Sequence, residues 1–85
     1  MKFYVYLLIS KNNDNIISYV GYTNNLENRL SKHNASRGAK FTRGRKWEMI
    51  YKKAYKTKSE AIKEEHKLKK NYLLTKKIKN KFLYE

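Results

Sequence analysis

The sequence predicts a small α/β (α+β) domain in which a three-stranded antiparallel sheet is flanked by helices, in the order ββαβαα. Two observations lead to this prediction. Three segments rich in β-branched and aromatic residues alternate in the manner of strands, and three others carry apolar residues at helical spacing. Because 85 residues suffice for one compact core and not for two, we expect residues 1–85 to form a single domain.

The first two strands are expected at residues 2–9 and 16–22, paired as an antiparallel hairpin. Within the first strand, odd-numbered residues would face one side of the sheet and even-numbered residues the other. A polar run rich in asparagine at residues 11–15 is typical of a turn. Gly21 would end or bend the second strand.

The first helix is expected to begin after Asn24, because Glu27 three residues later completes a motif similar to a capping box. Leu26 and Leu30 would lie on one side of this helix and pack against the sheet. The helix would end at residues 36–38.

The third strand is expected at residues 47–55, after a basic loop at residues 38–46 that contains two glycines and one aromatic residue. Its largest side chains would alternate onto one face of the sheet; they are Trp47, Met49, Tyr51 and Tyr55. The tyrosines expected to serve only in packing are Tyr51, Tyr55, Tyr72 and Tyr84.

Two helices are expected after the third strand. Thr57 and Glu60 form a second motif similar to a capping box, which predicts a helix over residues 58–70. A last helix is expected over residues 75–84. Its apolar stripe would consist of Leu74, Ile78 and Phe82.

Charge is the first indication of function. Lys and Arg number 21 against 7 Asp and Glu, which gives a formal net charge of +14 at pH 7. A positive field of this density attracts polyanions, and neutralised phosphates release their counterions, so nucleic acid is the expected partner. Lysines outnumber arginines 17 to 4, which favours contacts with phosphates and a weak sequence preference over base readout.

Absent features narrow the class of protein. No apolar run approaches the roughly 18 residues of a membrane span, and no small-residue cleavage site follows the apolar start. The chain has no cysteine, which excludes disulfides and thiolate metal sites. We therefore expect a cytoplasmic protein with no membrane contact. We also expect a monomer, since no long apolar stripe is left over once the core is formed.

One carboxylate occupies a core-facing position in the predicted helix at residues 58–70. The apolar stripe of that helix has Glu65 between Ala61 and Leu68, and a buried carboxylate is costly unless it is paired or binds a metal. Two interpretations stay open. Glu65 either pairs with a lysine such as Lys69 at the edge of the stripe or binds a metal ion.

A cation and an imidazole share one face of the first predicted helix. Arg29 and His33 are four residues apart, so they lie on adjacent turns. Either residue alone would usually be structural. Together they place a fixed positive charge beside a side chain that titrates near neutral pH.

These residues resemble the pattern of the GIY-YIG nuclease superfamily. Residues 4–6 (Tyr-Val-Tyr) and 19–21 (Tyr-Val-Gly) are similar to the two halves of its signature. Arg29 falls ten residues after the second half begins, His33 follows four residues later, and Glu65 lies on a helix after the third strand. The resemblance covers essentially the whole chain and is strongest to the short, single-domain, UvrC-like (UPF0213-type) branch.

The resemblance implies a metal-dependent endonuclease that hydrolyses phosphodiester bonds in DNA, with DNA repair or recombination as the implied setting. Glu65 would hold a single divalent ion, Mg²⁺ or Mn²⁺. Arg29 would bind the scissile phosphate. Tyr6 or Tyr19 would act as the general base, and His33 would relay the proton or hydrogen-bond the tyrosine.

The resemblance also suggests which residues surround this site. Many members carry an asparagine after the glutamate, and Asn71 and Asn80 are the available residues. DNA is expected rather than RNA as the partner. Contacts with it are expected from the basic C-terminal helix and from the loop at residues 37–46, where the expected residues are Arg37, Lys40, Arg43, Arg45 and Lys46.

Two alternatives to a nuclease stay open. One is a nucleic-acid-binding module that keeps the nuclease fold but has little intrinsic activity. The other is a basic structural protein, bound for instance to ribosomal RNA. A carboxylate on a surface that meets phosphates favours the nuclease, because without a metal its charge would repel the ligand.

Overall fold

The computed structural model describes residues 2–12 and 15–84, and its element order confirms the predicted ββαβαα arrangement. The elements of this described part are β1 (Phe3–Asn12), β2 (Asn15–Thr23), α1 (Leu26–Asn34), the 3₁₀ helix η1 (Lys40–Thr42), β3 (Glu48–Tyr55), α2 (Lys58–Lys70) and α3 (Tyr72–Tyr84). The predicted turn at residues 11–15 falls partly on residues 13 and 14, which lie outside the described residues.

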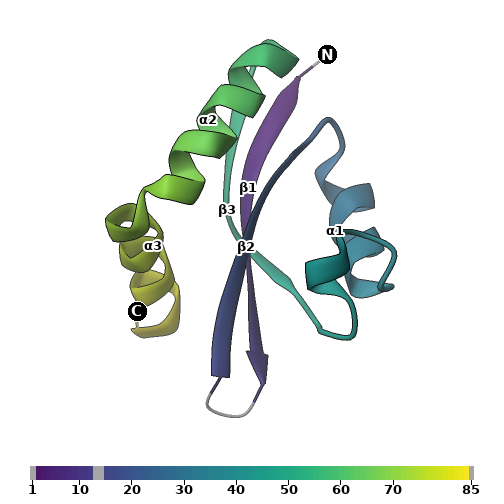
Figure 1. Cartoon of the computed structure of the whole chain (residues 1–85), viewed down its shortest axis with the longest axis vertical. Helices are drawn as coiled ribbons and strands as arrows, with labels where there is room; N and C mark the ends of the chain where they lie inside the picture. The colour runs from purple at the N-terminus through teal and green to yellow at the C-terminus, as the bar shows by residue number, and fades with distance from the viewer. Residues whose placement is uncertain (1, 13–14, 85) are drawn as a thin grey trace.

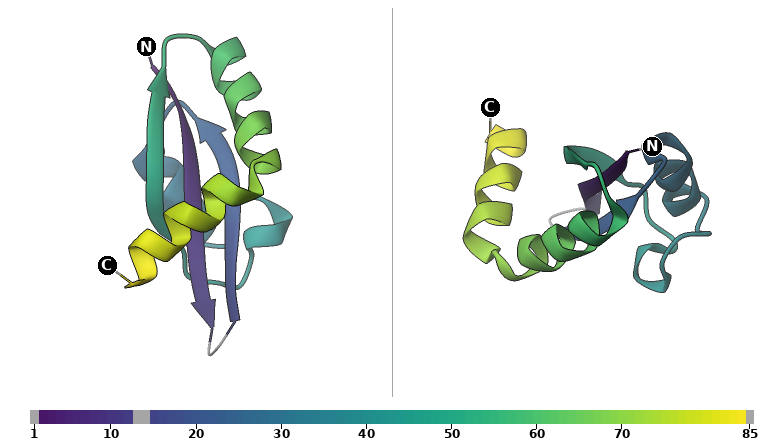
Figure 2. Two further views of the ribbon diagram at one scale, coloured as in Figure 1. Left: turned by 90° about the vertical axis from the view of Figure 1, so that its left-hand side faces the viewer. Right: turned by 90° about the horizontal axis from the view of Figure 1, so that it is seen from above.

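The three strands form one antiparallel sheet in the order β2-β1-β3, so the first strand of the chain is the central one (Figure 1). Helices α2 and α3 lie on one side of this sheet. Helix α1 and η1 lie on the other side, as the view from above shows (Figure 2, right). No helix in the described part of the chain is long and apolar enough to cross a membrane.

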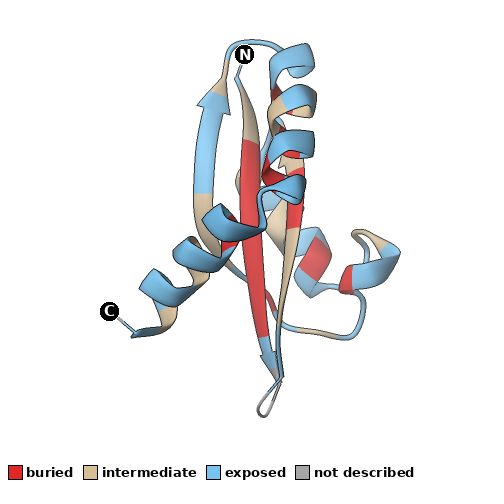
Figure 3. Cartoon of the chain, turned by 60° about the vertical axis from the view of Figure 1, so that its left-hand side comes forward, coloured by how far each residue is buried: buried red, intermediate tan, exposed pale blue. Residues whose placement is uncertain are grey.

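Strand β1 is buried on both faces of the sheet and forms the middle of the core (Figure 3). Val5 and Leu7 belong to a cluster that includes residues of α2, whereas Tyr6 and Leu8 belong to a cluster that includes residues of α1. This confirms the predicted alternation of odd and even residues. The α1 residues in the second cluster are Leu26 and Leu30, also as predicted.

A β-bulge in β3 places the odd-numbered side chains before it and after it on opposite faces of the sheet. Leu7 pairs with Tyr51 and Leu8 pairs with Met49, so Ile50 is an extra residue in β3. An extra residue reverses the alternation of the side chains that follow it. The prediction that the largest side chains of this strand share one face is therefore wrong. Trp47 and Met49 lie on the α1 side, and Tyr51 and Tyr55 lie on the α2 side.

Helix α1 is capped by Asn25 and not, as predicted, by Asn24. The side-chain oxygen of Asn25 accepts a hydrogen bond of 3.1 Å from the backbone N–H of Asn28. The extended backbone of Asn25 places this oxygen over the first turn of the helix. Asn25 therefore caps the helix in place of the predicted pair Asn24 and Glu27. The helix ends at Asn34, earlier than predicted.

Helix α2 has the predicted boundaries, but α3 begins three residues early. Thr57 caps α2 by accepting a hydrogen bond of 3.1 Å from the backbone N–H of Glu60, which confirms the predicted cap. Asn71 caps α3 in the same way, because its side chain accepts from the backbone N–H of Leu74 over 3.1 Å. This cap places residues 72–74 inside the last helix.

The predicted apolar stripe of α3 is only partly buried. Ile78 packs against the α2 cluster, but Leu74 and Phe82 are exposed. Tyr72 and Tyr84 are also exposed, so the prediction that they serve in packing is wrong, whereas Tyr51 and Tyr55 do pack against the core. Apolar surface therefore remains on α3. The expectation of a monomer assumed that no such surface was left over, so the monomer stays a prediction without that support.

Candidate active site

The hydroxyl group of Tyr6 lies at the centre of a buried polar cluster on the α1 side of the sheet. It is 2.9 Å from Nε2 of His33, and Nε of Arg29 donates a hydrogen bond to it over 3.4 Å. Both partners come from α1, where their spacing places them on one face of the helix. The structure thus brings these three predicted residues together.

Thr42 of η1 fixes the direction of the hydrogen bonds around His33. Its hydroxyl group donates to the carbonyl of Ala39 over 2.8 Å and lies 2.8 Å from Nδ1 of His33. Because a hydroxyl group has one hydrogen, Thr42 must accept from Nδ1–H, and Nε2 is left to accept from the hydroxyl of Tyr6. Sequence analysis missed Thr42, since a single threonine in a basic loop has no periodicity or spacing to mark it.

Two glycines make room for this cluster. A Cβ atom on Gly21 would collide with the hydroxyl group of Tyr6, and a Cβ atom on Gly38 would collide with Nδ1 of His33. Strand β2 continues to Thr23, so of the two predicted roles for Gly21, ending or bending the strand, the first is wrong. It permits the tyrosine of the neighbouring strand to cross over its backbone.

The surroundings of the Tyr6 phenol and of the His33 imidazole favour the neutral form of each group. Burial raises the pKa of Tyr6 above its usual value of 10.0, and the hydrogen bond from Arg29 opposes this effect only in part. Burial lowers the pKa of His33 below 6.5, and the charge of Arg29 lowers it further. Arg29 therefore acidifies the phenol, but burial has the larger effect and the net shift of the Tyr6 pKa is upward.

Tyr19 joins the cluster through its ring. Its ring centroid is 5.2 Å from that of His33 and 6.1 Å from that of Phe41, on which it stacks at an interplanar angle of 23°. The side chain is partly exposed, whereas Tyr6 is 1% exposed. Both tyrosines of the signature therefore contact the same imidazole, one by a hydrogen bond and one by ring packing.

Glu65 is the buried carboxylate of α2 and is 8% exposed. Its Oε1 atom forms an ion pair of 3.0 Å with Nζ of Lys69, so the pairing considered in the sequence analysis is confirmed. The carboxylate also lies close enough to the cluster for its charge to raise the pKa of Tyr6, as the smallest contribution to that shift. It belongs to the electrostatic surroundings of the same site.

The carboxylate of Glu65 is the type of ligand used by a hard divalent ion that is bound mainly by water and phosphate. Across residues 2–12 and 15–84, no three His, Asp or Glu side chains gather closely enough to form a protein-only metal site. Mg²⁺ commonly binds through one or two carboxylates and keeps several waters, while substrate phosphates complete its shell. A single buried carboxylate fits that requirement.

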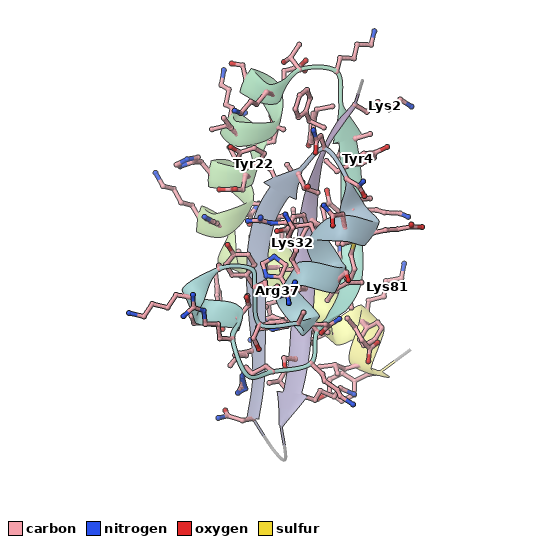
Figure 4. The ribbon with its side chains drawn as sticks, turned by 90° about the vertical axis from the view of Figure 1, so that its right-hand side faces the viewer. Lys2, Tyr4, Tyr22, Lys32, Arg37 and Lys81 are labelled. Atoms are coloured by element: carbon pink, nitrogen blue, oxygen red, sulfur yellow. The ribbon has the colours of Figure 1, made fainter. Side chains whose placement is uncertain are left out.

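The five residues predicted to contact nucleic acid lie after α1 and around η1. Figure 4 views the molecule from the α1 side and shows Arg37, together with Lys32 of α1, in front of the sheet. Arg45 differs from the others because it is partly buried, and its Nη1 atom has no hydrogen-bond partner among the described residues. The exposed members of the set are Arg37, Lys40, Arg43 and Lys46.

The two asparagines considered as partners of the glutamate do not join the cluster of Tyr6. The side chain of Asn71 is used in capping α3. Asn80 is exposed on α3, in a groove lined by Lys76 and Lys77.

Comparison with known proteins gives a consistent result. The family model described as the GIY-YIG catalytic domain matches residues 2–80. A UPF0213 protein of Oceanobacillus iheyensis is 48% identical over 67 residues, which cover 78% of this chain and 74% of that protein. One of Bacillus velezensis is 40% identical over 84 residues, which cover 98% of this chain and 77% of that protein. The solution NMR structure of a UPF0213 protein from Bacillus halodurans is 37% identical, covers 81% of this chain and 71% of its own, and has a TM-score of 0.46.

The sheet, the paired signature tyrosines and the arginine and histidine of α1 define a GIY-YIG domain, and the chain belongs to the GIY-YIG family. Within that family it is similar over most of its length to the UPF0213 proteins, as the sequence resemblance predicted.

Proposed function

We propose that the protein is a metal-dependent endonuclease that hydrolyses phosphodiester bonds in DNA with weak sequence preference. The observation that carries the proposal is the hydrogen-bonded series from Arg29 through Tyr6 and His33 to Thr42. A purely structural cluster has no evident need for a guanidinium group beside a phenol that is hydrogen-bonded to a neutral imidazole. Hydrolysis of a phosphodiester needs both a cationic group that binds the anionic phosphate and a group that accepts a proton from the attacking water.

Arg29 would bind the scissile phosphate. Its Nε atom is engaged by Tyr6, and the guanidinium group is partly exposed, so it links the buried phenol to the surface. Hydrogen bonds from a charged guanidinium to phosphate oxygens are strong, and they strengthen as negative charge develops in the transition state.

Tyr6 would accept the proton of the attacking water while its own phenolic proton passes to Nε2 of His33. The water oxygen then bonds to phosphorus as the bond to the leaving oxygen breaks, and the leaving oxygen takes a proton from solvent. The Nδ1–H group of the resulting imidazolium stays on Thr42. Between the two candidate bases we favour Tyr6 over Tyr19, because Tyr6 has a hydrogen-bonded acceptor for its proton.

Glu65 would hold the divalent ion, Mg²⁺ or Mn²⁺. When bound, such an ion supplies Lewis acidity and neutralises charge on the phosphoryl oxygens. Lys69 would have to leave Oε1 of Glu65 or share it, since the ammonium group now occupies that oxygen. This ion pair is also the observation that favours a second candidate, a nucleic-acid-binding module with the same fold and little intrinsic activity.

The proposal is tested by cleavage of fluorescently labelled DNA in Mg²⁺ by the wild type and by Tyr6→Phe. The phenylalanine keeps the ring but removes the proton acceptor, so we expect a rate loss of about 100-fold or more. Tyr51→Phe is the matched control, because this tyrosine packs on the opposite face of the sheet. Cleavage by Tyr6→Phe at the rate of the control would show that this phenol takes no part in the reaction.

A further inference from the structure

A groove of about 500 Å³ runs beside the edge strand β2, between η1 and the junction of α2 with α3. The view from above shows α2 and α3 on one side of the sheet that contains β2, and η1 on the other side (Figure 2, right). The residues that line the groove include two exposed aromatic side chains and two lysines. They are Ser18, Tyr19, Val20, Phe41, Lys69, Tyr72, Thr75 and Lys79.

Two aromatic side chains of this groove are open to solvent, and one of them, Phe41, is also held in place by neighbouring rings. Phe41 is 59% exposed, yet its ring stacks on Tyr19 and contacts Trp47 at a centroid distance of 6.4 Å. Tyr72 is 65% exposed, at the start of α3. An exposed ring fixed by neighbouring rings is a ready surface for stacking, because its orientation is already set before a ligand binds.

The lysines give the groove the charge of a phosphate-binding surface. Lys69 and Lys79 line it, and Lys76 places its Nζ atom 5.9 Å from the ring centroid of Tyr72. Two aromatic rings with lysines around them match the pattern of proteins that bind single strands, where bases stack on rings and cations neutralise the backbone.

The groove is continuous with the candidate active site. Tyr19 lines the groove and also packs against His33. Lys69 lines the groove and also forms the ion pair with Glu65. A nucleotide held in the groove would therefore lie next to the groups proposed to act on the phosphodiester.

We propose that this groove binds an unpaired nucleobase, which stacks on Phe41 and Tyr72 while Lys69 and Lys79 neutralise the adjacent phosphates. Inside a duplex both faces of a base are covered by its neighbours, so only a single-stranded or locally unpaired nucleotide offers a face to these rings. That the bound strand is also the substrate rests on the proposed nuclease function. It makes single-stranded nucleic acid, and DNA with unpaired nucleotides, the preferred substrate class.

Binding in EDTA tests the groove without requiring cleavage. Fluorescence anisotropy would give the Kd for a labelled single-stranded DNA 12-mer, the same sequence as RNA, and the matching duplex DNA. We expect tighter binding of single strands than of duplex. Phe41→Ala and Tyr72→Ala should each weaken single-strand binding about 5- to 150-fold, the effect of losing one stacked base, and should leave duplex binding nearly unchanged.

Tyr84→Ala is the matched control, because Tyr84 is 79% exposed on α3 and does not line the groove. Phe41→Trp keeps a stacking ring and should retain binding, which separates loss of stacking from loss of folding. The proposal is overturned if single strand and duplex bind equally, or if the two alanine variants behave like Tyr84→Ala. Binding with these preferences but no cleavage in Mg²⁺ would support the groove and reject the nuclease.

Discussion

The side chain of His33 is held in one tautomer by a threonine that reaches it from the 3₁₀ helix. Thr42→Val keeps the shape of the side chain but leaves Nδ1–H of the buried imidazole without its acceptor. We expect a loss of about 1–3 kcal/mol in the free energy of unfolding, the usual cost of a buried unpaired donor. Urea unfolding measures this loss, and ¹⁵N chemical shifts of His33 report the tautomer.

Thr42→Ser is the matched variant, because it retains the hydroxyl group that accepts from His33 and donates to Ala39. It should keep the Nδ1-protonated tautomer and most of the stability. If the valine variant kept both the stability and the tautomer of the wild type, Thr42 would not be what orients the imidazole.

The lowered pKa of His33 predicts how stability depends on pH. The folded-state pKa lies below the ordinary value of 6.5, so between the two values the unfolded chain binds a proton that the folded protein does not. The free energy of unfolding should therefore fall as pH drops below 6.5, by at most about 1.4 kcal/mol per pH unit for one site, and level off below the folded pKa. His33→Gln should remove this component.

The control for the pH measurement is His66→Gln, which changes an exposed histidine of α2. It should retain the pH dependence of the wild type when chemical unfolding is followed from pH 7 to pH 5. Equal pH dependence in the wild type and in His33→Gln would mean that the imidazole gains a proton as readily in the folded as in the unfolded protein.

At the scale of single residues, sequence patterns identified most of the polar cluster around Tyr6 but not the residues that support it. Tyr6, Arg29 and His33 stand at spacings that the family resemblance marks, and the structure brings them together. Thr42 and Gly38 were not predicted, because their roles depend on how the loop after α1 folds back onto the imidazole. That path is set by tertiary packing and leaves no local periodicity.

At the scale of single elements, the cap of α1 gives a direct test of the register of that helix. Asn25→Ala should lower the free energy of unfolding by about 1 kcal/mol, since the side chain satisfies the N–H of Asn28. Asn24→Ala, one residue earlier, should change it by less than about 0.5 kcal/mol. Urea unfolding compares the two variants, and a larger loss for Asn24→Ala would restore the cap first predicted from the sequence.

The elements themselves could be predicted where local patterns decide them. The first hairpin and helix α2 follow from alternation and from the Thr57 cap. The faces of β3 could not be predicted, because the bulge at Ile50 depends on pairing with β1. The start of α3 was misplaced because the capping role of Asn71 was not recognised.

For the whole molecule, the net charge of +14 predicts binding to nucleic acid that weakens steeply with salt. Replacing the exposed Arg43 with Gln should weaken binding about equally for all sequences and reduce the slope of log K against log salt by about one. Lys53→Gln is the control and should leave the slope unchanged, because this exposed lysine of β3 lies with Val5 and Tyr55 on the α2 side of the sheet. An unaltered slope for Arg43→Gln would place the binding surface elsewhere.

The measurement that tests the nuclease most directly is the rate of DNA cleavage as Mg²⁺ is titrated, for the wild type, Glu65→Gln and Glu64→Gln. The last variant is the control, because Glu64 is less buried than Glu65 and pairs with Lys67 at 3.4 Å. We predict cleavage that saturates with Mg²⁺, stops in EDTA, is lost in Glu65→Gln and is kept in Glu64→Gln. Cleavage by Glu65→Gln at the wild-type rate, or no cleavage by the wild type at any Mg²⁺ concentration, would contradict the proposed metal-dependent nuclease.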